Sequence, residues 1–267
     1  MIGDIAPQAA LLRGFATDFL TSHDEAEVER IMDSAYRLSI GGFLLDGRDE
    51  AYFPATAVQL AQFPGLCVTV HDAIIGTDHV AMRFTEHGAS VRDGGRLAAW
   101  GGVTLFRIVG GRLAEGWAEE DYFARKRQLK SGVCDPIRAP GTAPWDRPAT
   151  PPDARTEDAV RAWLARPEVL LDPLVEEVLI DGPGFAAMID PGETKLNALF
   201  TAGSRAAFHL DLVGTYRGGF DDLDQATIGH PVTLRLAGLI DVADGKVVRA
   251  QVSGDRLGFH RSLLKRG

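Results

Sequence analysis

The stretch RIVGGRLAEGWAEEDYFARKRQL, residues 107–129, predicts a β-hairpin followed by a short helix. Two β-rich runs flank the Gly-Gly pair at 110–111, which is typical of a tight hairpin turn. The second run carries Trp117, Glu119 and Asp121 on alternate positions. Such an ending has two interpretations: a strand end that meets water, or the acid/base end of a pocket.

The rest of the first half surrounds this hairpin with elements of two kinds. Helical spacing of apolar residues comes first and β-type runs follow, so an α+β fold is expected. The predicted helices cover residues 8–22, 24–36 and 50–62, and the predicted strands cover 66–75, 79–88, 97–109 and 112–121.

Composition places the chain among ordinary globular proteins. It has 267 residues, 45% apolar and 24% charged, with a net charge of −9 and a pI near 5.3. This balance lacks the basic footprint of a nucleic-acid binder. No apolar run reaches 18 residues, no signal layout is seen and only Cys67 and Cys134 are present, so a reducing cytoplasm is expected.

A proline-rich segment divides the chain. Residues 134–154 hold six prolines, which break helices and cannot donate to a strand ladder. The second half repeats the rhythm of the first: residues 76–90 align with 202–216, and 95–129 align with the end of the chain, so that Asp121 falls on Asp255. We therefore expect a first domain at 1–132, a linker at 133–154 and a shortened second domain at 155–267.

The pattern then resembles a known family. Phe106-Arg107-Ile108, Gly111-Arg112-Leu113, Trp117, Asp121 and Gln128-Leu129 are similar to the motif of the SnoaL-like branch of the NTF2-like superfamily. The resemblance covers most of residues 8–130 and, more weakly, 155–265. It implies two fused cone-shaped α+β domains, each with helices packed on a curved antiparallel sheet around a deep pocket.

The resemblance also implies site residues. Polyketide cyclases of this family carry an acid/base carboxylate on the last strand, and the matching position here is Asp121. They also carry a histidine on the preceding strand, and here the nearest matching position is Arg107, so the sequence departs from the family pattern. Because the superfamily is functionally diverse, the fold alone does not fix the chemistry.

Counting back from the turn gives an expected register for the hairpin. Trp100 would face Asp121, and Thr104 would face Trp117, so that these four residues and Glu119 share one face. A carboxylate among aromatic side chains should have a raised pKa and could transfer a proton. The alternative is that Asp121 simply caps the following helix, since aspartate is a good N-cap residue. A one-residue bulge would reverse the assignment of faces.

Other side chains of the first half are weaker candidates. His71, in an apolar strand, could act as a base or a pocket donor, and Arg83 could hold an enolate or a carboxylate. A satisfied core histidine and a strand ion pair are the respective alternatives. Tyr36 and Tyr52 could supply hydroxyl donors to a substrate that Trp100, Trp117 and Thr104 surround, although tyrosine is more often a core residue.

The second half offers a parallel set of candidates. His209 and Asp211 alternate on one strand and, with Asp255, could form a second acid/base cluster; a plain amphipathic strand is the alternative. This copy has lost the aromatic residues of the first. We expect the first domain to carry the chemistry and the second to cover its apolar sheet as a built-in partner, in a monomeric pseudo-dimer or a homodimer.

The sequence shows none of the usual motifs for a metal, a dinucleotide or a nucleophilic serine, so no cofactor is expected. The preferred function is a cofactor-free acid/base enzyme that cyclises by an aldol-type step, or isomerises, an apolar carbonyl compound in natural-product biosynthesis. Its alternatives are an enzyme that opens epoxides and a non-catalytic protein that binds a small ligand or another protein. No nucleic-acid or membrane partner is expected.

Overall fold

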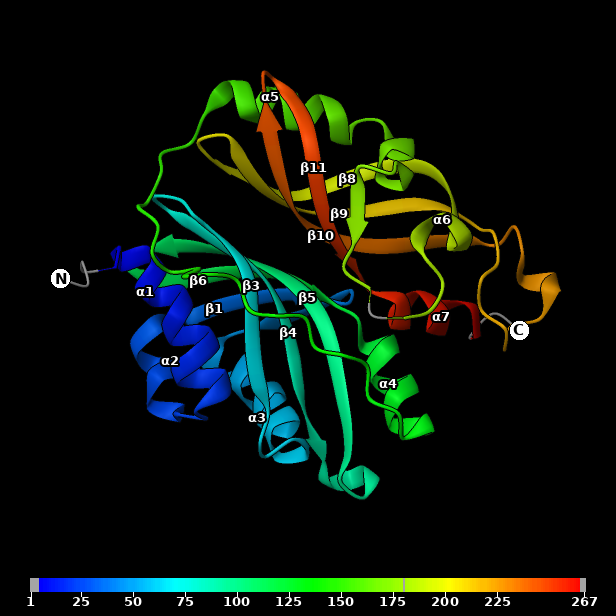
Figure 1. Ribbon diagram of the computed structural model, residues 1–267, viewed down its shortest axis with the longest axis horizontal. Helices are drawn as coiled ribbons and strands as arrows, with labels where there is room; N and C mark the ends of the chain where they lie inside the picture. Colours follow the sequence, from blue (N-terminus) through cyan, green and yellow to red (C-terminus); the bar gives the residue numbers. More distant parts are fainter. Residues whose placement is uncertain (1–4, 180, 265–267) are drawn as a thin grey trace.

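The computed structural model describes residues 5–179 and 181–264, which form two α+β units joined by a linker (Figure 1). The outermost ends of the two expected domains, residues 1–4 and 265–267, lie outside the described residues. The first unit contains α1 (Pro7–Arg13), the π-helix η1 (Gly14–Thr21), α2 (Glu25–Ile31), β1 (Met32–Ile40), β2 (Phe43–Asp46), the π-helix η2 (Arg48–Tyr52), α3 (Phe53–Gln62), β3 (Cys67–Ile75), β4 (His79–Ser90), the 3-10 helix η3 (Val91–Asp93), β5 (Arg96–Val109), β6 (Arg112–Glu120) and α4 (Tyr122–Ser131).

The second unit has fewer elements before its sheet. It contains α5 (Ala154–Leu164), the 3-10 helix η4 (Pro167–Leu171), β7 (Val175–Glu177), α6 (Phe185–Met188), β8 (Ile189–Ala202), β9 (Arg205–Tyr216), the 3-10 helix η5 (Gln225–Thr227), β10 (Pro231–Ala243), β11 (Lys246–Gly254) and α7 (Arg256–Leu264). The sheet orders are β2-β1-β6-β5-β4-β3 and β7-β11-β10-β9-β8. In each unit an early strand, β1 or β7, pairs in parallel with the last strand. The expected α+β architecture of two fused units is confirmed.

The segment after α2 differs from the expected helix and loop. The helix begins at the cap Asp24, whose side chain accepts from the Ala26 amide, but it ends at Ile31. Residues 32–40 continue as β1, because pairing with β2 and β6 satisfies their backbone groups along the edge of the sheet. In β1, Tyr36 and Leu38 are buried on alternate positions, which is strand periodicity. The prediction of a helix to residue 36 was therefore wrong.

The β5–β6 hairpin contains one extra residue that the expected register lacked. Arg107 pairs with Glu115 whereas Ile108 pairs with Leu113, so Ala114 is left over as a β-bulge. Beyond the bulge every partner on β6 is shifted by one residue. Because side chains alternate across a strand, this shift moves each β6 side chain to the opposite face of the sheet from the expected one.

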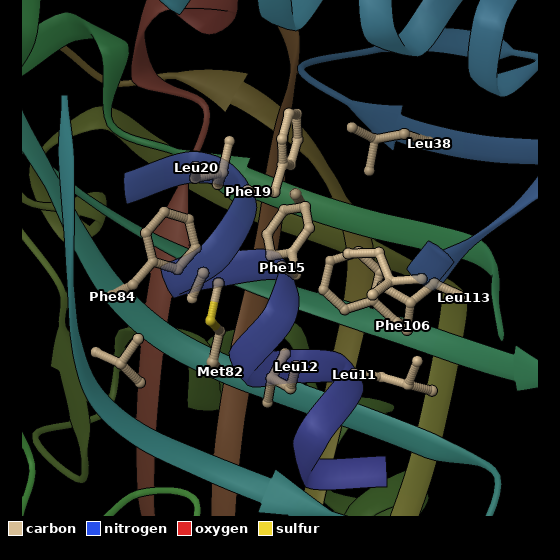
Figure 2. Close-up of a cluster of buried hydrophobic side chains, with 14 of the residues drawn as sticks. Leu11, Leu12, Phe15, Phe19, Leu20, Leu38, Met82, Phe84, Phe106 and Leu113 are labelled. Atoms are coloured by element: carbon tan, nitrogen blue, oxygen red, sulfur yellow. The ribbon is translucent and has the colours of Figure 1, made fainter. Parts of the chain in front are cut away.

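The core of the first unit lies between its curved sheet and the N-terminal helices. Figure 2 shows Leu12 beside Met82 of β4 and Phe15 beside Phe106 of β5. The rings of Phe15 and Phe106 meet edge to face at 4.8 Å between centroids. Burying this apolar stripe drives the docking of the helices, which close one face of the sheet.

The opposite face of the first sheet packs against the second sheet. Small side chains, among them Ala81, Ala207 and Ala237, let the two sheets approach, and larger ones such as Leu105 and Leu239 complete the layer. The second unit therefore buries an apolar face that would otherwise be exposed. The linker follows the β3 edge, where Gly141 and Thr150 donate backbone hydrogen bonds to β3. No helix within the described residues is long and apolar enough to cross a membrane.

Buried and partly buried polar pairs connect the two units around this apolar layer. The Asp121 carboxylate accepts from the Arg256 guanidinium in a bidentate pair, with 3.0 Å from Nε to Oδ1, and both side chains are fully buried. Asp72 pairs with Arg205 at 2.6 Å. Glu119 lies 2.9 Å from Nε2 of His209, a ring whose pKa burial lowers to about 4.

Replacing Arg256 by methionine should destabilise the protein strongly. The Asp121 carboxylate would stay buried without its partner, which typically costs about 3–5 kcal/mol. Urea unfolding of the full chain measures this change. The matched control is Arg249→Met, which removes a half-exposed guanidinium from β11 and should cost less than about 1 kcal/mol. Equal decreases in the unfolding free energy of the two variants would contradict the proposed contribution of the Asp121–Arg256 pair to stability.

Candidate active site

A cavity of about 350 Å³ opens between the concave face of the first sheet, the helices that cover it and α7 of the second unit. This volume is within the usual range for a small-molecule site. Its wall is largely apolar and aromatic, with Phe15, Phe84 and Phe106 among the lining residues. The cavity is therefore suited to a compact apolar ligand.

Two glutamates bring carboxyl groups into this apolar cavity. Glu86 belongs to β4 and Glu120 is the last residue of β6, and both are buried and line the cavity. The bulge at Ala114 places Glu120, and neither of its neighbours Glu119 and Asp121, on the cavity face. The two carboxyl groups lie near each other, since each affects the pKa of the other.

Each carboxyl group has its own set of donors. Trp100 Nε1 donates to Glu120 Oε2 at 2.9 Å, and the Tyr122 hydroxyl also hydrogen-bonds to Glu120. On the other side, Gln59 Nε2 donates to Glu86 Oε2 at 2.7 Å. Such a network orients both groups before any substrate enters.

A cation lies beside this pair without contacting either carboxylate closely. Arg125 Nη1 donates to Gln59 Oε1 at 2.9 Å. Its guanidinium lies over the rings of Tyr122 and Trp100, at 4.3 and 4.9 Å from their centroids. Within the described residues it forms no ion pair shorter than 4.0 Å. The aromatic rings therefore stabilise a positive charge close to the carboxyl pair.

Burial and mutual repulsion separate the protonation states of the two glutamates. Burial raises the pKa of Glu86 well above its ordinary value, and repulsion from Glu120 raises it further. Burial also raises the pKa of Glu120, but hydrogen bonds from Trp100 and Tyr122 oppose that rise. Glu86 is therefore the group that keeps its proton, and Glu120 is the one that ionises first.

Hydroxyl groups face the same space. The side chains of Tyr36, Tyr52 and Thr104 all line the cavity, so the structure brings these three predicted binding residues together. The buried Tyr36 hydroxyl has no hydrogen-bond partner among the described residues. It lies where a Cβ of residue 116 would be, which explains why that position is Gly116.

Comparison with known proteins shows which family the unit that contains this cavity resembles. Residues 10–129 match the family model described as SnoaL-like polyketide cyclase. This half of the chain is similar to SnoaL-like proteins over nearly all of its length, and it is called the SnoaL-like domain for that similarity. Similar solved structures include IdmH of Streptomyces antibioticus, AclR of Streptomyces galilaeus and TsrD of Streptomyces laurentii.

These structures are each matched over less than half of the present chain. The identities are 18%, 18% and 23%, with TM-scores of 0.41, 0.43 and 0.42 in the same order. The matches cover 46%, 48% and 47% of this chain and 98%, 98% and 96% of the respective relatives. No protein of curated function matches the sequence.

The candidate carboxylates Asp121 and Glu119 lie on the other face of the SnoaL-like sheet. Asp121 caps α4 by accepting from the Ala124 amide and pairs with Arg256 of the second domain. Glu119 binds His209 across the same interface. The expected register, which placed both carboxylates beside Trp100, was wrong because it omitted the bulge at residue 114.

Trp117 and Arg107 also lie outside the cavity. Trp117 packs into the apolar layer between the two sheets, and it lines a smaller space of about 210 Å³ there with His79 and Phe200. Arg107 pairs with Glu115 at 3.1 Å near the hairpin turn. Trp100, in contrast, contacts the carboxyl pair through its indole N–H and therefore belongs to the site.

His71 and Arg83 face the linker and the second domain, away from the cavity. His71 contacts the Ala139 carbonyl through Nδ1 and the Thr85 hydroxyl through Nε2, at 2.9 and 2.8 Å. Burial lowers the pKa of both His71 and Arg83. His71 holds the linker against β3, and the structure gives neither residue a place beside Glu86.

Two of the second-domain candidates are linked and the third lies elsewhere: Asn197 Nδ2 is 3.2 Å from both His209 Nδ1 and Asp211 Oδ1, and Asp255 is not part of this group. His209 contacts Glu119, and Asp211 receives a hydrogen bond from Asn197, whereas Asp255 lines the cavity of the SnoaL-like domain. The second domain also lacks the carboxyl pair. By the alignment of the two halves, Leu212 and Gly254 replace the two glutamates, and Leu212 is part of a filled apolar core.

Four residues that line the cavity were not predicted from the sequence: Glu86, Glu120, Gln59 and Arg125. A signal for Glu86 exists: Val80, Met82 and Phe84 alternate toward the core, and Glu86 is the next residue in that row. Glu120 gives no such signal, because its face depends on the bulge. Within the described residues, no three His, Cys, Asp or Glu side chains are grouped as metal ligands.

Replacing Glu86 by glutamine should stabilise the protein as the pH rises. The folded-state pKa of Glu86 is raised, so the fold favours the acid form, and its stabilising contribution is lost as the pH rises through that value. Glutamine resembles the neutral acid at every pH. Unfolding free energies of wild type and variant should therefore converge at about pH 4 and diverge in favour of the variant toward about pH 9.

The exposed Glu193 serves as the control for this measurement. A Glu193→Gln variant should follow the wild-type protein across the same pH range. If Glu86→Gln behaves like this control, the Glu86 carboxyl does not carry a raised pKa.

Proposed function

We propose that the SnoaL-like domain is a cofactor-free acid/base catalyst for a small apolar carbonyl compound, acting by aldol-type cyclisation or isomerisation. The observation that carries the proposal is the buried pair Glu86–Glu120 inside an aromatic cavity. The family description suggests a polyketide-like intermediate of a natural-product pathway as the substrate. The cytoplasm is the proposed compartment.

The pair can supply an acid and a base at the same pH. The Glu120 carboxylate takes a proton from the carbon next to the substrate carbonyl, while the Glu86 carboxyl gives its proton to the carbonyl oxygen. The product of this step is an enol, and the two glutamates have exchanged protonation states. No outside proton is needed, because one proton enters the pair as another leaves it.

Two fates of the enol give the two proposed reactions. In a cyclisation, the enol carbon attacks a second carbonyl of the same molecule; Glu120 gives its proton to the new alkoxide, and the regenerated carbonyl returns its proton to Glu86. In an isomerisation, the enol is conjugated with a second double bond; Glu120 delivers its proton to the far carbon of that system, and the enol oxygen returns its proton to Glu86 as the carbonyl re-forms. Both fates restore the starting protonation states of the pair.

The surroundings of the pair assist this chemistry. The Arg125 guanidinium lowers the pKa of Glu120 and would stabilise negative charge that develops on the substrate oxygen. The aromatic wall excludes water, which strengthens these interactions. A structural role for the pair is a poor explanation, because burying two carboxyl groups together opposes folding. This argument also disfavours a purely binding protein.

Epoxide opening is a second candidate that the same pair supports. Protonated Glu86 could donate to an epoxide oxygen while Glu120 activates a water or an internal hydroxyl. The observation in its favour is that the proposed acid and base line one cavity and affect each other's pKa, and that the amide of Gln59 donates to Glu86. Hydrolysis of an epoxide in ¹⁸O-labelled water, followed by mass spectrometry, distinguishes this reaction from carbonyl chemistry.

Replacing Glu120 by glutamine should abolish most proton abstraction. With 2-tetralone as a carbonyl probe in D₂O, wild type should accelerate deuterium exchange next to the carbonyl, as followed by NMR. Loss of a general base typically lowers such a rate by roughly 10²–10⁴-fold. Glu86→Gln should lower the rate as well, because its amide cannot give up a proton.

The control is Glu115→Gln, a substitution on the same strand at a residue that pairs with Arg107 away from the cavity. It should keep the wild-type exchange rate. Full activity in Glu120→Gln, or no exchange by wild type with any carbonyl probe together with diol formation from an epoxide, would overturn the proposed carbonyl reaction.

The rate should depend on pH as a bell-shaped curve. Activity should rise as Glu120 ionises, at a pH above the ordinary pKa of a glutamate because burial raises it, and it should fall as Glu86 loses its proton. A profile of kcat/KM against pH for the exchange reaction measures both limbs. A Glu86→Gln variant that retains residual activity should lose the falling limb.

A further inference from the structure

The cavity wall of the SnoaL-like domain is completed by the second domain. Asp255, Leu257, Gly258 and Arg261, at the start and along the side of α7, line the same cavity as the carboxyl pair. Figure 1 shows α7 beside the turn that joins β1 and β2 and near the beginning of α4. The second domain therefore contributes directly to the space that a substrate would occupy.

Asp255 lines this cavity and carries a buried acceptor atom. Its side chain is only 6% exposed. Oδ1 accepts from the Gly258 amide at 2.7 Å and so caps α7, whereas Oδ2 has no hydrogen-bond partner within the described residues. The nearest cation is Arg235, whose Nη1 is 3.8 Å from Oδ2. A buried carboxylate oxygen without a donor is costly, so a ligand that donates to it would be favoured.

The matching residue of the first domain shows what Asp255 lacks. Asp121 occupies the equivalent position before α4, and both of its oxygens bind Arg256 across the interface. The residue equivalent to Arg256 in the first domain is Tyr122, which hydrogen-bonds to Glu120 in its own cavity. Among the residues that the structure describes, no such donor hydrogen-bonds to Oδ2 of Asp255, and Arg235 stays 3.8 Å away. Asp121 thus has a donor for both of its oxygens, whereas Asp255, which lines the cavity, has a hydrogen-bond donor for only one of them within the described residues.

We propose that Asp255 binds a hydroxyl group of the substrate, and that the second domain in this way determines which compounds the SnoaL-like domain accepts. This inference rests on the proposed function only in requiring that the cavity be the substrate site. A hydroxyl is favoured over an ammonium group, because Arg235 and Arg261 already place positive charge near Asp255. Asp255 is a specificity residue and takes no part in the proton transfer.

The Asp255 carboxylate requires glycine at residue 258. A side chain there would collide with the carboxylate, because an added Cβ would lie 1.9 Å from Oδ2. Glycine at this position therefore keeps the carboxylate in place at the start of α7. The equivalent residue in the first domain is Ala124, whose amide is bound by the paired Asp121.

The experiment compares two probes that differ by one hydroxyl group, 2-tetralone and 6-hydroxy-2-tetralone. A hydrogen bond to a buried carboxylate is worth roughly a 10- to 100-fold gain in affinity. Wild type, measured by calorimetry, should therefore bind the hydroxylated probe tighter by about that factor. Asp255→Asn should abolish the preference and leave the affinity for 2-tetralone within about twofold, because asparagine still caps α7 but presents N–H groups to the cavity.

The matched control is Asp153→Asn, the same substitution at the cap of α5, outside the cavity. It should keep the full hydroxyl preference. The Glu120→Gln variant should also keep it, since the preference is a binding property that needs no catalysis.

The outcomes separate this inference from the proposed function. A wild-type protein without hydroxyl preference, or an Asp255→Asn protein that retains it, would refute the role of Asp255 while leaving the acid/base proposal intact. Failure of both probes to bind any variant would overturn both, since the cavity would then not be a ligand site. Loss of preference in Asp153→Asn as well would assign the effect to helix capping and would also refute the role of Asp255.

Discussion

One surplus residue in β6, Ala114, decides how the chemistry of this protein is arranged. The bulge shifts the pairing of β6 with β5 by one position, so that Gly102 lies opposite Glu120. Since neighbouring side chains on a strand point to opposite faces, the shift sends Glu120 into the cavity and sends Glu119 and Asp121 into the interface. Without the bulge, the cavity would receive two carboxylates from β6 and the interface would receive one.

The three consecutive carboxylates thus have different partners, and their roles support one another. Asp121 and Glu119 bind Arg256 and His209 of the second domain and hold the end of β6. Glu120 lies between them, so the same contacts fix the backbone that positions its carboxyl group beside Glu86. The domain interface is in this sense part of the preorganisation of the site.

The two halves of the chain have the same hairpin geometry but different interiors. The β10–β11 hairpin carries its bulge between Asp241 and Val242, which align with Arg107 and Ile108 of the first half. This agreement supports a duplication. Inside the second domain, however, apolar residues fill the positions of the carboxyl pair, and its contribution to the cavity comes from α7 at its outer edge. The second domain thus contributes part of the cavity wall and, among its described residues, has no carboxyl pair of its own.

Much of this organisation is determined locally by the sequence. The helix-then-strand order, the proline-rich linker, the repeat of the hairpin and the equivalence of Asp121 and Asp255 all follow from residue patterns. The sequence also singles out Trp100, which donates to Glu120, and Tyr36, which lines the cavity. These features depend mainly on residues that are close to one another in the sequence.

Only the tertiary structure decided which carboxylates share the cavity. Glu86 and Glu120 come from different strands, and their meeting depends on register, on the bulge and on burial, none of which is a local property. Likewise, only the tertiary structure shows that Oδ2 of Asp255 has no hydrogen-bond donor among the described residues. A Gly-Gly turn predicts that a hairpin forms. The face to which a side chain far from the turn points, however, depends on the number of residues between it and the turn, and one inserted residue reverses that face.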